Sequence, residues 1–408
     1  MNEHRDRHRL AWFILLSSFF LCVALAIGTP LGVRQFIRTA RVRQEVVLEP
    51  QRGTPSMQRG GAGPVEAVIE PIPNILPNTF IATDENAHST LTIYVPSNEQ
   101  VAAATVQIYN STDLVFVSAR SPRFDVSPLP HAAVIQVTSG RVRVTVAEVH
   151  GRPTVVTLHT PHASAALSEG SYEVRVNAAF TEFAVREGVA EVSNDNDAQI
   201  SLGPSERTIA RPGATSLASF EGERNLLSNG NFDQALERYW DVYERDVQNQ
   251  PGGTVGITSF GGRSAARFQR LQEGMGHAEV GIQQTVNYDV RDFSSLTLHL
   301  NIQILYQSLR GCGTLGSECP IMIRIAYKDV DGTDREWYHG FYALDAAESD
   351  LLAAWDEQVP GSTWYTFDSG NLMELFERPP ASIKEIAIYA SGHAFDALVT
   401  EVELLAQE

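Results

Sequence analysis

The feature that most constrains the fold is a run of alternating apolar and polar residues at 133–146, AVIQVTSGRVRVTV. A second run at 181–192, TEFAVREGVAEV, repeats the pattern, and a glycine interrupts each run, Gly140 in the first and Gly188 in the second. Period-two alternation places one face of a strand in a core and the other in water. Glycine suits a tight turn because it adopts positive φ and allows close approach. We therefore expect two strand–turn–strand units whose turns serve architecture rather than chemistry.

Similar short runs fill the chain between residues 65 and 212. They follow one another at about 8–12 residues, a spacing typical of an all-β sandwich, roll or solenoid-like sheet. No stretch of helical periodicity of useful length comes between them. The predicted fold class is all-β.

The order of these runs resembles the FecR domain family of bacterial envelope signalling proteins. Four pieces carry the resemblance: 134–146, 155–176, 183–192 and 200–210. The resemblance implies a FecR-like β domain at 65–212. Within the second piece, the positions that match the family's Thr-Pro and Gly-Thr-x-Phe pattern are occupied by Thr160, Pro161, Gly170, Ser171 and Tyr172.

The chain departs from that family ahead of the predicted membrane segment. Signalling proteins of the family carry there a cytoplasmic domain that binds a sigma factor. Only residues 1–9, a short tail, precede Leu10, and they are too few for such a domain. Sigma-factor regulation is therefore not expected. The alternative function that remains is an envelope signalling accessory whose FecR-like domain contacts a protein partner.

The segment 225–408 resembles the jelly-roll modules of the carbohydrate-binding, galactose-binding-like type. These begin with Asn-Leu-x-x-Asn-Gly-x-Phe-Glu and a Trp about ten residues later, and Asp233 stands here for the usual Glu. The resemblance implies a β-sandwich jelly roll, preceded by a Pro-Gly linker at 213–224. The matching positions are Asn225, Leu226, Asn229, Gly230, Phe232 and Trp240.

The run from Leu10 to Val33 contains no charged residue. A bilayer-spanning helix needs about 20 apolar residues, and a helix satisfies its own backbone in lipid. We therefore predict a transmembrane helix at 10–33 with the lipid bilayer as its partner. A cleaved signal peptide is the alternative, because Ala24-Leu25-Ala26 forms an A-x-A site.

The predicted localisation is the cell membrane, single-pass, with a cytoplasmic N-terminus and extracytoplasmic C-terminal domains. Long following domains translocate largely regardless of flanking charge. Residues 34–64 are rich in Gly, Pro, Gln and Arg with little periodicity, which predicts a flexible tether.

The formal net charge of -18 argues against nucleic acid as a partner, because phosphate-backbone binding needs a concentrated basic surface. The excess of carboxylates is compatible with neutral ligands such as sugars, or with cationic ones. No motif for nucleophilic, metal-dependent or phosphate chemistry is present. We therefore expect a protein that is not an enzyme.

Two small groups of residues have a structural and a chemical interpretation. Cys312 and Cys319 bracket the loop CGTLGSEC; they form either a disulfide in an oxidising compartment or two reduced thiols. Asp329, Asp331 and Asp334 surround an Asp-Gly turn. They are weak candidates for calcium ligands, and a solvated hairpin is the favoured interpretation because the EF-hand spacing is missing. No cofactor is expected, although the jelly-roll resemblance allows a structural calcium.

Aromatic residues cluster in the last domain. Sugar rings stack on aromatic side chains while polar groups reach the hydroxyls. A sandwich core also uses aromatics, and alternation in WYHGFY at 337–342 places one set of its side chains in the core. We expect a non-catalytic, membrane-anchored extracytoplasmic protein that recognises a glycan, a polysaccharide or another envelope component. The candidate ligand-binding residues are Trp240, Trp337, Tyr338, Tyr342, Trp355 and Trp364.

Overall fold

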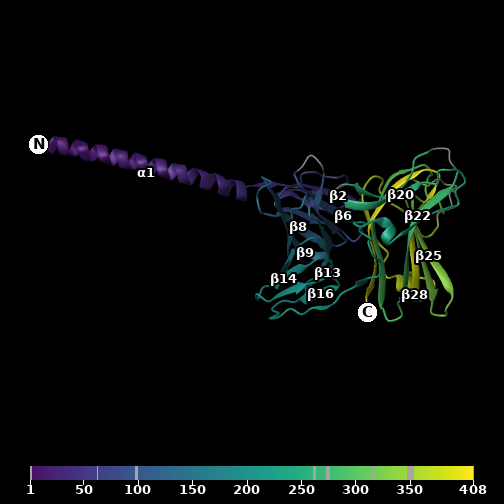
Figure 1. Cartoon of the computed structure of the whole chain (residues 1–408). Coiled ribbons are helices and arrows are strands. Elements are labelled where there is room, and N and C mark those ends of the chain that lie inside the picture. The colour runs from purple at the N-terminus through teal and green to yellow at the C-terminus, as the bar shows by residue number, and fades with distance from the viewer. Residues whose placement is uncertain are drawn as a thin grey trace.

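The computed structural model describes residues 2–61, 63–96, 100–260, 263–272, 276–314, 316–346 and 353–407. Over these residues one long N-terminal helix precedes two β-sandwich domains (Figure 1). The predicted fold class is confirmed. Beyond the long helix, the described helical segments are short: η1 Arg59–Gly61, η2 Leu236–Arg238 and α2 Leu372–Leu375.

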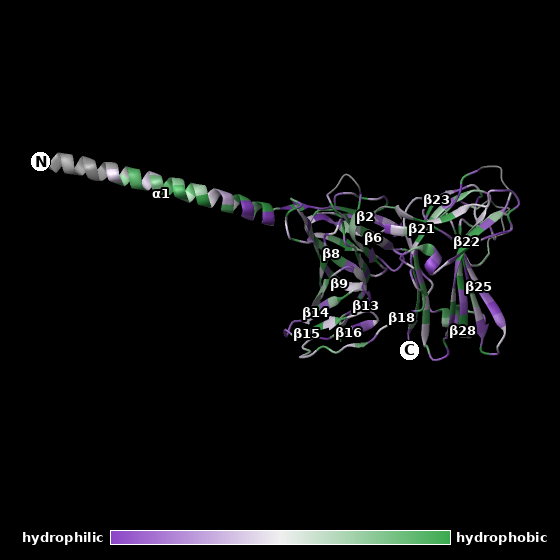
Figure 2. Cartoon of the chain, in the orientation of Figure 1, coloured by the Kyte–Doolittle hydropathy of each residue, from purple (hydrophilic) through white to green (hydrophobic). Residues whose placement is uncertain are grey.

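Helix α1 spans Asn2–Thr39 and projects from the first domain (Figure 1). It is longer than the predicted segment because Arg and Gln, which flank the apolar run, are good helix formers. Its part from Leu15 to Thr39 is long and apolar enough to cross a membrane, as a signal sequence near an N-terminus also is. Figure 2 shows this apolar part in green and hydrophilic residues where the helix meets the first domain.

The first domain consists of two sheets that share strand β9. One sheet has the order β4-β3-β5-β8-β9-β10-β11-β14-β15, with β1 also paired to β8, and the other has the order β2-β6-β7-β9-β12-β13-β16-β17. An apolar core that includes Phe116, Ile135 and Phe183 fills the space between them. The strands are β1 Arg41–Arg43, β2 Glu45–Arg52, β3 Ser56–Gln58, β4 Val65–Ala67, β5 Thr79–Ala82, β6 His88–Tyr94, β7 Ala102–Ile108, β8 Asp113–Pro122, β9 His131–Val146, β10 Thr154–His159, β11 Ala163–Leu167, β12 Gly170–Val176, β13 Thr181–Glu187, β14 Ala190–Asn194, β15 Gln199–Leu202, β16 Glu206–Ala210 and β17 Phe220–Glu221.

Gly140 and Gly188 mark places where the chain passes from one sheet to the other. Gly140 bends β9, so that its first half pairs with β8 and β10 and its second half with β7 and β12. Gly188 separates β13 from β14, which belong to different sheets. Both have positive φ, and a Cβ would lie 2.5 Å from Thr112 Cα at Gly140 and 2.1 Å from the Glu169 carbonyl oxygen at Gly188. Glycine is therefore required as expected, but the breaks are corners between sheets rather than hairpin turns.

The predicted flexible tether at 34–64 is wrong. Only Ala40 separates α1 from β1, and β2 pairs with β6 from Glu45 opposite Tyr94 to Arg52 opposite His88. The side chains of Val46, Leu48 and Met57 are fully buried in the first core. Most of the Gly and Pro residues that suggested a tether lie between the short strands, and Pro50 lies within β2 at a bulge in its pairing with β6.

The second domain is a sandwich of two antiparallel-rich sheets around an apolar core that contains Phe232 and Trp240. One sheet has the order β20-β21-β29-β23-β27 with β18 on β29, and the other has the order β19-β22-β28-β24-β25-β26. The predicted linker at 213–224 includes β17, which pairs with β16 of the first domain. The strands are β18 Arg224–Asn225, β19 Asp241–Arg245, β20 Thr254–Phe260, β21 Arg263–Arg270, β22 Ala278–Asp289, β23 Ser295–Gln307, β24 Ile321–Asp329, β25 Asp334–Tyr342, β26 Asp356–Gln358, β27 Tyr365–Asp368, β28 Pro380–Gly392 and β29 Phe395–Gln407.

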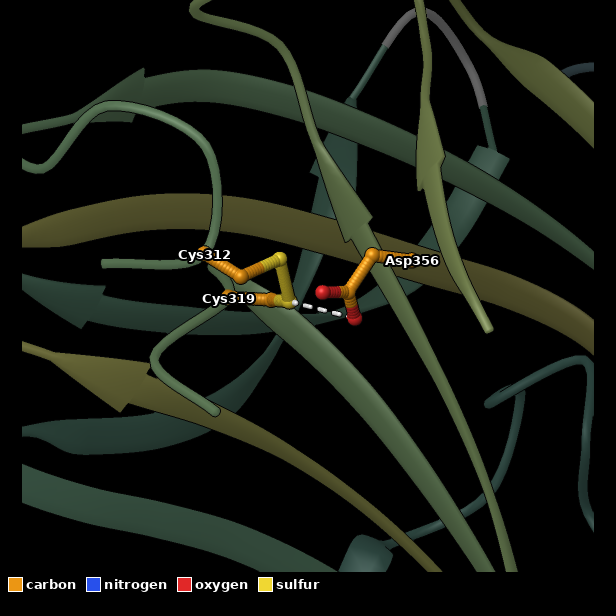
Figure 3. Close-up of side chains that lie close together, drawn as sticks. All are labelled: Cys312, Cys319 and Asp356. Carbon is orange, nitrogen blue, oxygen red and sulfur yellow. Dashed lines mark hydrogen bonds between the residues drawn. A yellow bond between two sulfur atoms is a disulfide. The ribbon is translucent and has the colours of Figure 1, made fainter. Parts of the chain in front are cut away.

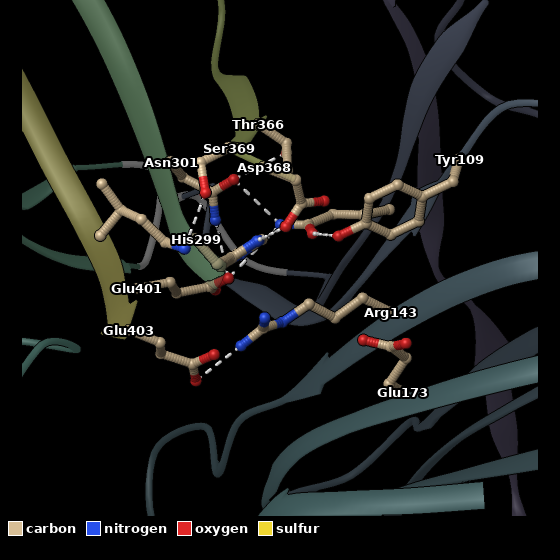
Figure 4. A network of polar contacts seen from close by, with 12 residues as sticks. Tyr109, Arg143, Glu173, His299, Asn301, Thr366, Asp368, Ser369, Glu401 and Glu403 are labelled. Carbon is tan, nitrogen blue, oxygen red and sulfur yellow. Dashed lines mark hydrogen bonds and ion pairs between the residues drawn. The ribbon is translucent and has the colours of Figure 1, made fainter. Parts of the chain in front are cut away.

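A buried polar network joins the two domains (Figure 4). Arg143 on β9 forms an ion pair of 2.7 Å with Glu403 on β29. Glu401, also on β29, accepts hydrogen bonds from Asn301 at 2.7 Å and from the Thr145 hydroxyl at 3.2 Å. Because these contacts use buried side chains of both domains, the β23–β29 sheet lies against the first domain. The opposite sheet of the sandwich therefore faces away from it.

Candidate functional site

The outward surface of the β19-β22-β28-β24-β25-β26 sheet carries a group of large side chains, which we call the tyrosine face. Alternation along each strand sends Ile323 and Ile388 into the core and their neighbours outward. Gly281 makes room among the rings, because a Cβ there would lie 2.6 Å both from Tyr243 Cζ and from Tyr389 Cβ. The members of the tyrosine face are Tyr243, Met322, Arg324, Tyr338, Tyr342 and Tyr389.

Charged groups lie among these rings. The Arg324 guanidinium forms ion pairs with Glu336, at 2.7 Å, and with Glu385. The Tyr338 hydroxyl donates to Glu336 at 2.6 Å. This surface therefore offers flat apolar rings beside fixed donors and acceptors.

The charged neighbours determine how the tyrosines titrate. Burial first, and then the hydrogen-bonded Glu336 carboxylate, raises the pKa of Tyr338 to about 12. Burial and the Glu279 carboxylate raise the pKa of Tyr243 and of Tyr389. The Tyr338 hydroxyl and the Arg324 guanidinium lower the pKa of Glu336, although burial opposes them. At neutral pH the tyrosines are therefore hydrogen-bond donors and Glu336 is an ionised acceptor.

The loop from Cys312 to Cys319 packs over one end of the tyrosine face, and a disulfide joins the two cysteines (Figure 3). Gly340 on β25 makes this packing feasible, because a Cβ there would lie 2.5 Å from Cys319 Sγ. Asp356 Oδ1 lies 3.7 Å from the same sulfur. These three groups have the proximity of a metal site, but sulfurs joined in a disulfide offer no thiolate ligand. Their role here is to pack the loop onto the sheet.

Three of the aromatic residues expected to bind a ligand lie on or beside this face. Tyr338 and Tyr342 belong to it, and Tyr342 is 6% exposed beneath the disulfide loop. Trp355 precedes β26, is 45% exposed, and has its ring centroid 6.4 Å from that of Tyr338. Tyr338 and Trp355 thus form an aromatic edge that a ligand can reach.

The other three expected residues lie elsewhere. Trp240 is 1% exposed, and its indole packs in the core 6.0 Å from the Phe232 ring. Trp337 points to the core side of β25 and stacks on His339. Trp364 immediately precedes β27, in the sheet that faces the first domain, and the Arg263 guanidinium lies 5.7 Å from its ring. Alternation and burial place Trp240 and Trp337 in or against the core rather than on the tyrosine face.

Two of the three candidate carboxylates of the β24–β25 hairpin already have protein partners. Asp329 is buried and accepts from the backbone N–H groups of Asp331 and Thr333 and from Arg335 Nε. Asp334 forms an ion pair with Lys384 at 2.7 Å. These contacts match the structural interpretation of this turn.

Sequence reasoning missed Tyr389 and Arg324. The pattern IAIYA at 386–390 alternates, and so does IMIRI at 321–325. Both patterns place these two side chains opposite the isoleucines, so the signal was present in the sequence. Their proximity to Tyr338 depends on the strand order β28-β24-β25, which alternation does not reveal.

Two cavities lie away from the tyrosine face. One of about 370 Å³ lies between the domains and has Arg143, Glu187, Asp233 and Glu401 in its lining. Another of about 600 Å³ lies at the end of the first domain near α1, beside His131 and Arg152. Neither lining contains a Trp, Tyr or Phe, so neither offers a ring on which a sugar could stack.

Comparison with known proteins shows no matching family model and no matching curated protein. Solved structures that share local similarity include a protein from Parabacteroides distasonis described as an anti-sigma factor, at 17% identity over 35% of this chain and 59% of that one, with a TM-score of 0.26. They also include the family 11 carbohydrate-binding module of the Clostridium thermocellum cellulase Lic26A-Cel5E, at 16% identity over 45% of this chain and 95% of the module, with a TM-score of 0.27. A third is TmCBM61 in complex with beta-1,4-galactotriose, at 13% identity over 45% and 99%, with a TM-score of 0.26. The chain is thus similar in part to proteins of both kinds, and likenesses at these TM-scores carry no argument about its function.

Proposed function

We propose that this protein is a non-catalytic, membrane-anchored binding protein whose second domain holds a neutral glycan on the tyrosine face. The observation that carries the proposal is the aromatic edge of Tyr338 and the exposed Trp355, with ring centroids 6.4 Å apart. This edge continues into Tyr243 and the buried Tyr389 on two further strands of the sheet. Aromatic rings stack on the apolar faces of sugars, while fixed polar groups hold the hydroxyls. Arg324 and Glu336 supply those groups beside Tyr338.

The charge of the chain indicates the class of glycan. A formal net charge of -18 repels polysaccharides that carry carboxylates or sulfates. Arg324 does not offset this repulsion, because Glu336 and Glu385 already flank it. The ligand is therefore an uncharged polysaccharide. Helix α1 anchors the protein in the membrane, and the second domain binds the polysaccharide from there.

Two of the three carboxylates among these rings, Glu336 and Glu385, support binding over hydrolysis, whereas burial raises the pKa of the third, Glu279. A glycosidase needs one carboxyl group with a raised pKa that stays protonated to act as the acid. The pKa of Glu336 is lowered, and Glu385 is held in an ion pair with Arg324. These two groups can accept hydrogen bonds from sugar hydroxyls but are poorly suited to deliver a proton.

The test is retention of the full-length protein, in detergent, on a panel of immobilised neutral polysaccharides. We expect at least one to retain it, and we expect Tyr338→Ala to weaken that retention about tenfold or more, since a lost stacking contact removes on the order of 1.4 kcal/mol. Tyr306→Ala is the matched control, because Tyr306 is an exposed tyrosine on β23 of the other sheet. Absence of retention on every glycan would overturn the proposal and favour a protein partner.

A further inference from the structure

The first domain contacts the last turns of α1 closely. The Ser127 hydroxyl donates to the Arg38 carbonyl oxygen at 2.7 Å, and the Arg123 backbone N–H donates to the Ala40 carbonyl oxygen at 2.9 Å. The rings of Phe36 and Phe124 meet edge to face with centroids 5.9 Å apart. The loop of residues 123–130 is therefore held beside the helix.

These contacts fix the depth of that loop relative to a membrane. The uncharged run of α1 ends at Val33, and Arg38 follows five residues later. At 1.5 Å per residue, Arg38 lies about 8 Å beyond the end of the apolar run. The headgroup layer on each side of a bilayer is roughly 5–8 Å thick. When α1 spans a bilayer, loop 123–130 therefore lies at the level of the lipid headgroups.

Exposed arginines follow the apolar run, on α1, β1, β8 and the start of the loop. Among the described residues none of them forms an ion pair with a carboxylate, whereas many arginines elsewhere in the chain do. Arg43 on β1 lies directly opposite Arg120 on β8, a pairing of like charges that is unfavourable, and the Arg43 guanidinium also donates to the carbonyl oxygens of Asn74, at 3.4 Å, and Ile75. We call this set the arginine collar: Arg34, Arg38, Arg41, Arg43, Arg120 and Arg123.

The loop also exposes apolar surface at the same level. Val126 is 76% exposed, and Phe36 on the adjoining turn of α1 is 55% exposed. Asp125 in the loop and Glu45 at the start of β2 are the carboxylates nearest in sequence, so positive charge dominates in a chain whose net charge is -18. Basic residues around apolar side chains are typical of surfaces that bind the membrane interface.

We propose that the arginine collar and Val126 bind the headgroup layer of an anionic phospholipid bilayer and hold the first domain against it. This inference rests on the membrane anchoring of α1 in the proposed function, but not on glycan binding. In this arrangement the first domain contacts lipid directly and does not move freely relative to the membrane. The polar network with Arg143 and Glu403 then extends this fixed placement to the second domain.

The experiment places an environment-sensitive fluorophore at position 126 of the full-length protein, as Val126→Cys in a Cys22→Ser background. The protein is reconstituted into vesicles of phosphatidylcholine alone or with about one third phosphatidylglycerol. We expect blue-shifted emission and quenching by headgroup-proximal quencher lipid, stronger in the anionic vesicles and weaker in high salt. The same label at Asp331→Cys, on the exposed β24–β25 turn, should show neither effect.

Charge-reversal variants test the contribution of the arginine collar to lipid contact separately from that of loop 123–130. Arg120→Glu with Arg123→Glu should at least halve the quenching at position 126 in anionic vesicles, whereas Arg378→Glu, an exposed arginine of the second domain, should leave it unchanged. Equal spectra at positions 126 and 331 in every vesicle would overturn the proposal. Flotation of the protein with vesicles reports the anchoring separately: a chain that does not float refutes the anchor, and the lipid-contact proposal with it.

Discussion

Arg143 of the first domain and Glu403 of the second form an ion pair of 2.7 Å, in which Arg143 is 1% and Glu403 12% exposed. The same guanidinium donates to the Ser171 hydroxyl at 3.1 Å. Burial of either charge alone would be unfavourable, because no opposite charge would then offset the free energy lost on its desolvation. The pair therefore fixes how the domains meet.

Removal of one partner should be strongly destabilising. Glu403→Gln leaves the Arg143 guanidinium buried without its counter-charge, and we expect a loss of about 3–5 kcal/mol in the free energy of unfolding. Chemical denaturation followed by intrinsic fluorescence measures this loss. Glu237→Gln, at an exposed position of η2, should change the free energy of unfolding by less than about 0.5 kcal/mol. Equal effects of the two variants would contradict the role of the pair.

Acid should weaken the same interface. Burial alone would raise the pKa of Asp368, but His299 and Arg141 outweigh it and hold that pKa well below 3.8. Arg143 and His299 likewise lower the pKa of Glu403 against the effect of burial. Carboxyl groups with a lower pKa in the folded state bind fewer protons than in the unfolded state. Their stabilisation is therefore present above about pH 4 and is lost as the pH falls through the folded-state values.

Denaturation curves between pH 5 and pH 2.5 test this dependence. We expect the free energy of unfolding to fall with falling pH in the unmodified protein. Asp368→Asn should be less stable at pH 5 and should show a shallower decline, because one of the linked protonations is gone. Identical slopes in the two proteins would show that Asp368 does not contribute to the acid sensitivity.

Substitutions of Trp240 and Trp355, both candidate ligand-binding residues from the sequence, should have opposite effects on stability and on glycan binding. Trp240 lies in the core and Trp355 at the edge of the tyrosine face. Trp240→Ala should lower the free energy of unfolding by about 3–5 kcal/mol through the cavity it leaves. Trp355→Ala should change stability by about 0.5 kcal/mol or less but should weaken retention on the glycan. Thermal unfolding and the polysaccharide columns provide the two readouts.

The disulfide loop should affect both stability and binding. The bond between Cys312 and Cys319 closes a short loop over Met322 and Tyr342. The double variant Cys312→Ser with Cys319→Ser should cost about 2–3 kcal/mol, the value that chain entropy gives for a loop this short. It should also loosen that end of the tyrosine face and lower retention on the glycan. Unchanged retention would place the ligand entirely toward Tyr338 and Tyr243.

The corners between sheets provide a steric test. Gly188 and Gly213 both have positive φ, but a Cβ at Gly188 meets the Glu169 carbonyl oxygen at 2.1 Å, whereas none of the described atoms lies within 4 Å of one at Gly213. Gly213→Ala should cost about 1 kcal/mol from backbone conformation alone. Gly188→Ala should cost a further 1–3 kcal/mol from overlap. Denaturation of both variants under one set of conditions checks the difference.

Several features could be predicted from the sequence because they depend on local patterns. Alternation predicted the strands on both sides of Gly140, and the uncharged run predicted a long helix that includes Leu10–Val33. The segment after that helix was misjudged, because its strands are short and its Gly and Pro residues resemble a linker. Val46 and Leu48 become buried only because β6 lies beside β2.

The sequence by itself determined which side chains of a strand share a face, because the backbone alternates with a period of two whatever surrounds it. It therefore established that Tyr338 and Trp337 point to opposite sides of β25. Only the tertiary structure decided that Tyr338 shares a face with Tyr389 and Tyr243, and that Arg143 meets Glu403. Those contacts join strands that are far apart in the chain. The free energy that favours them comes from the burial of surface in both sandwiches rather than from the conformational preference of any short segment.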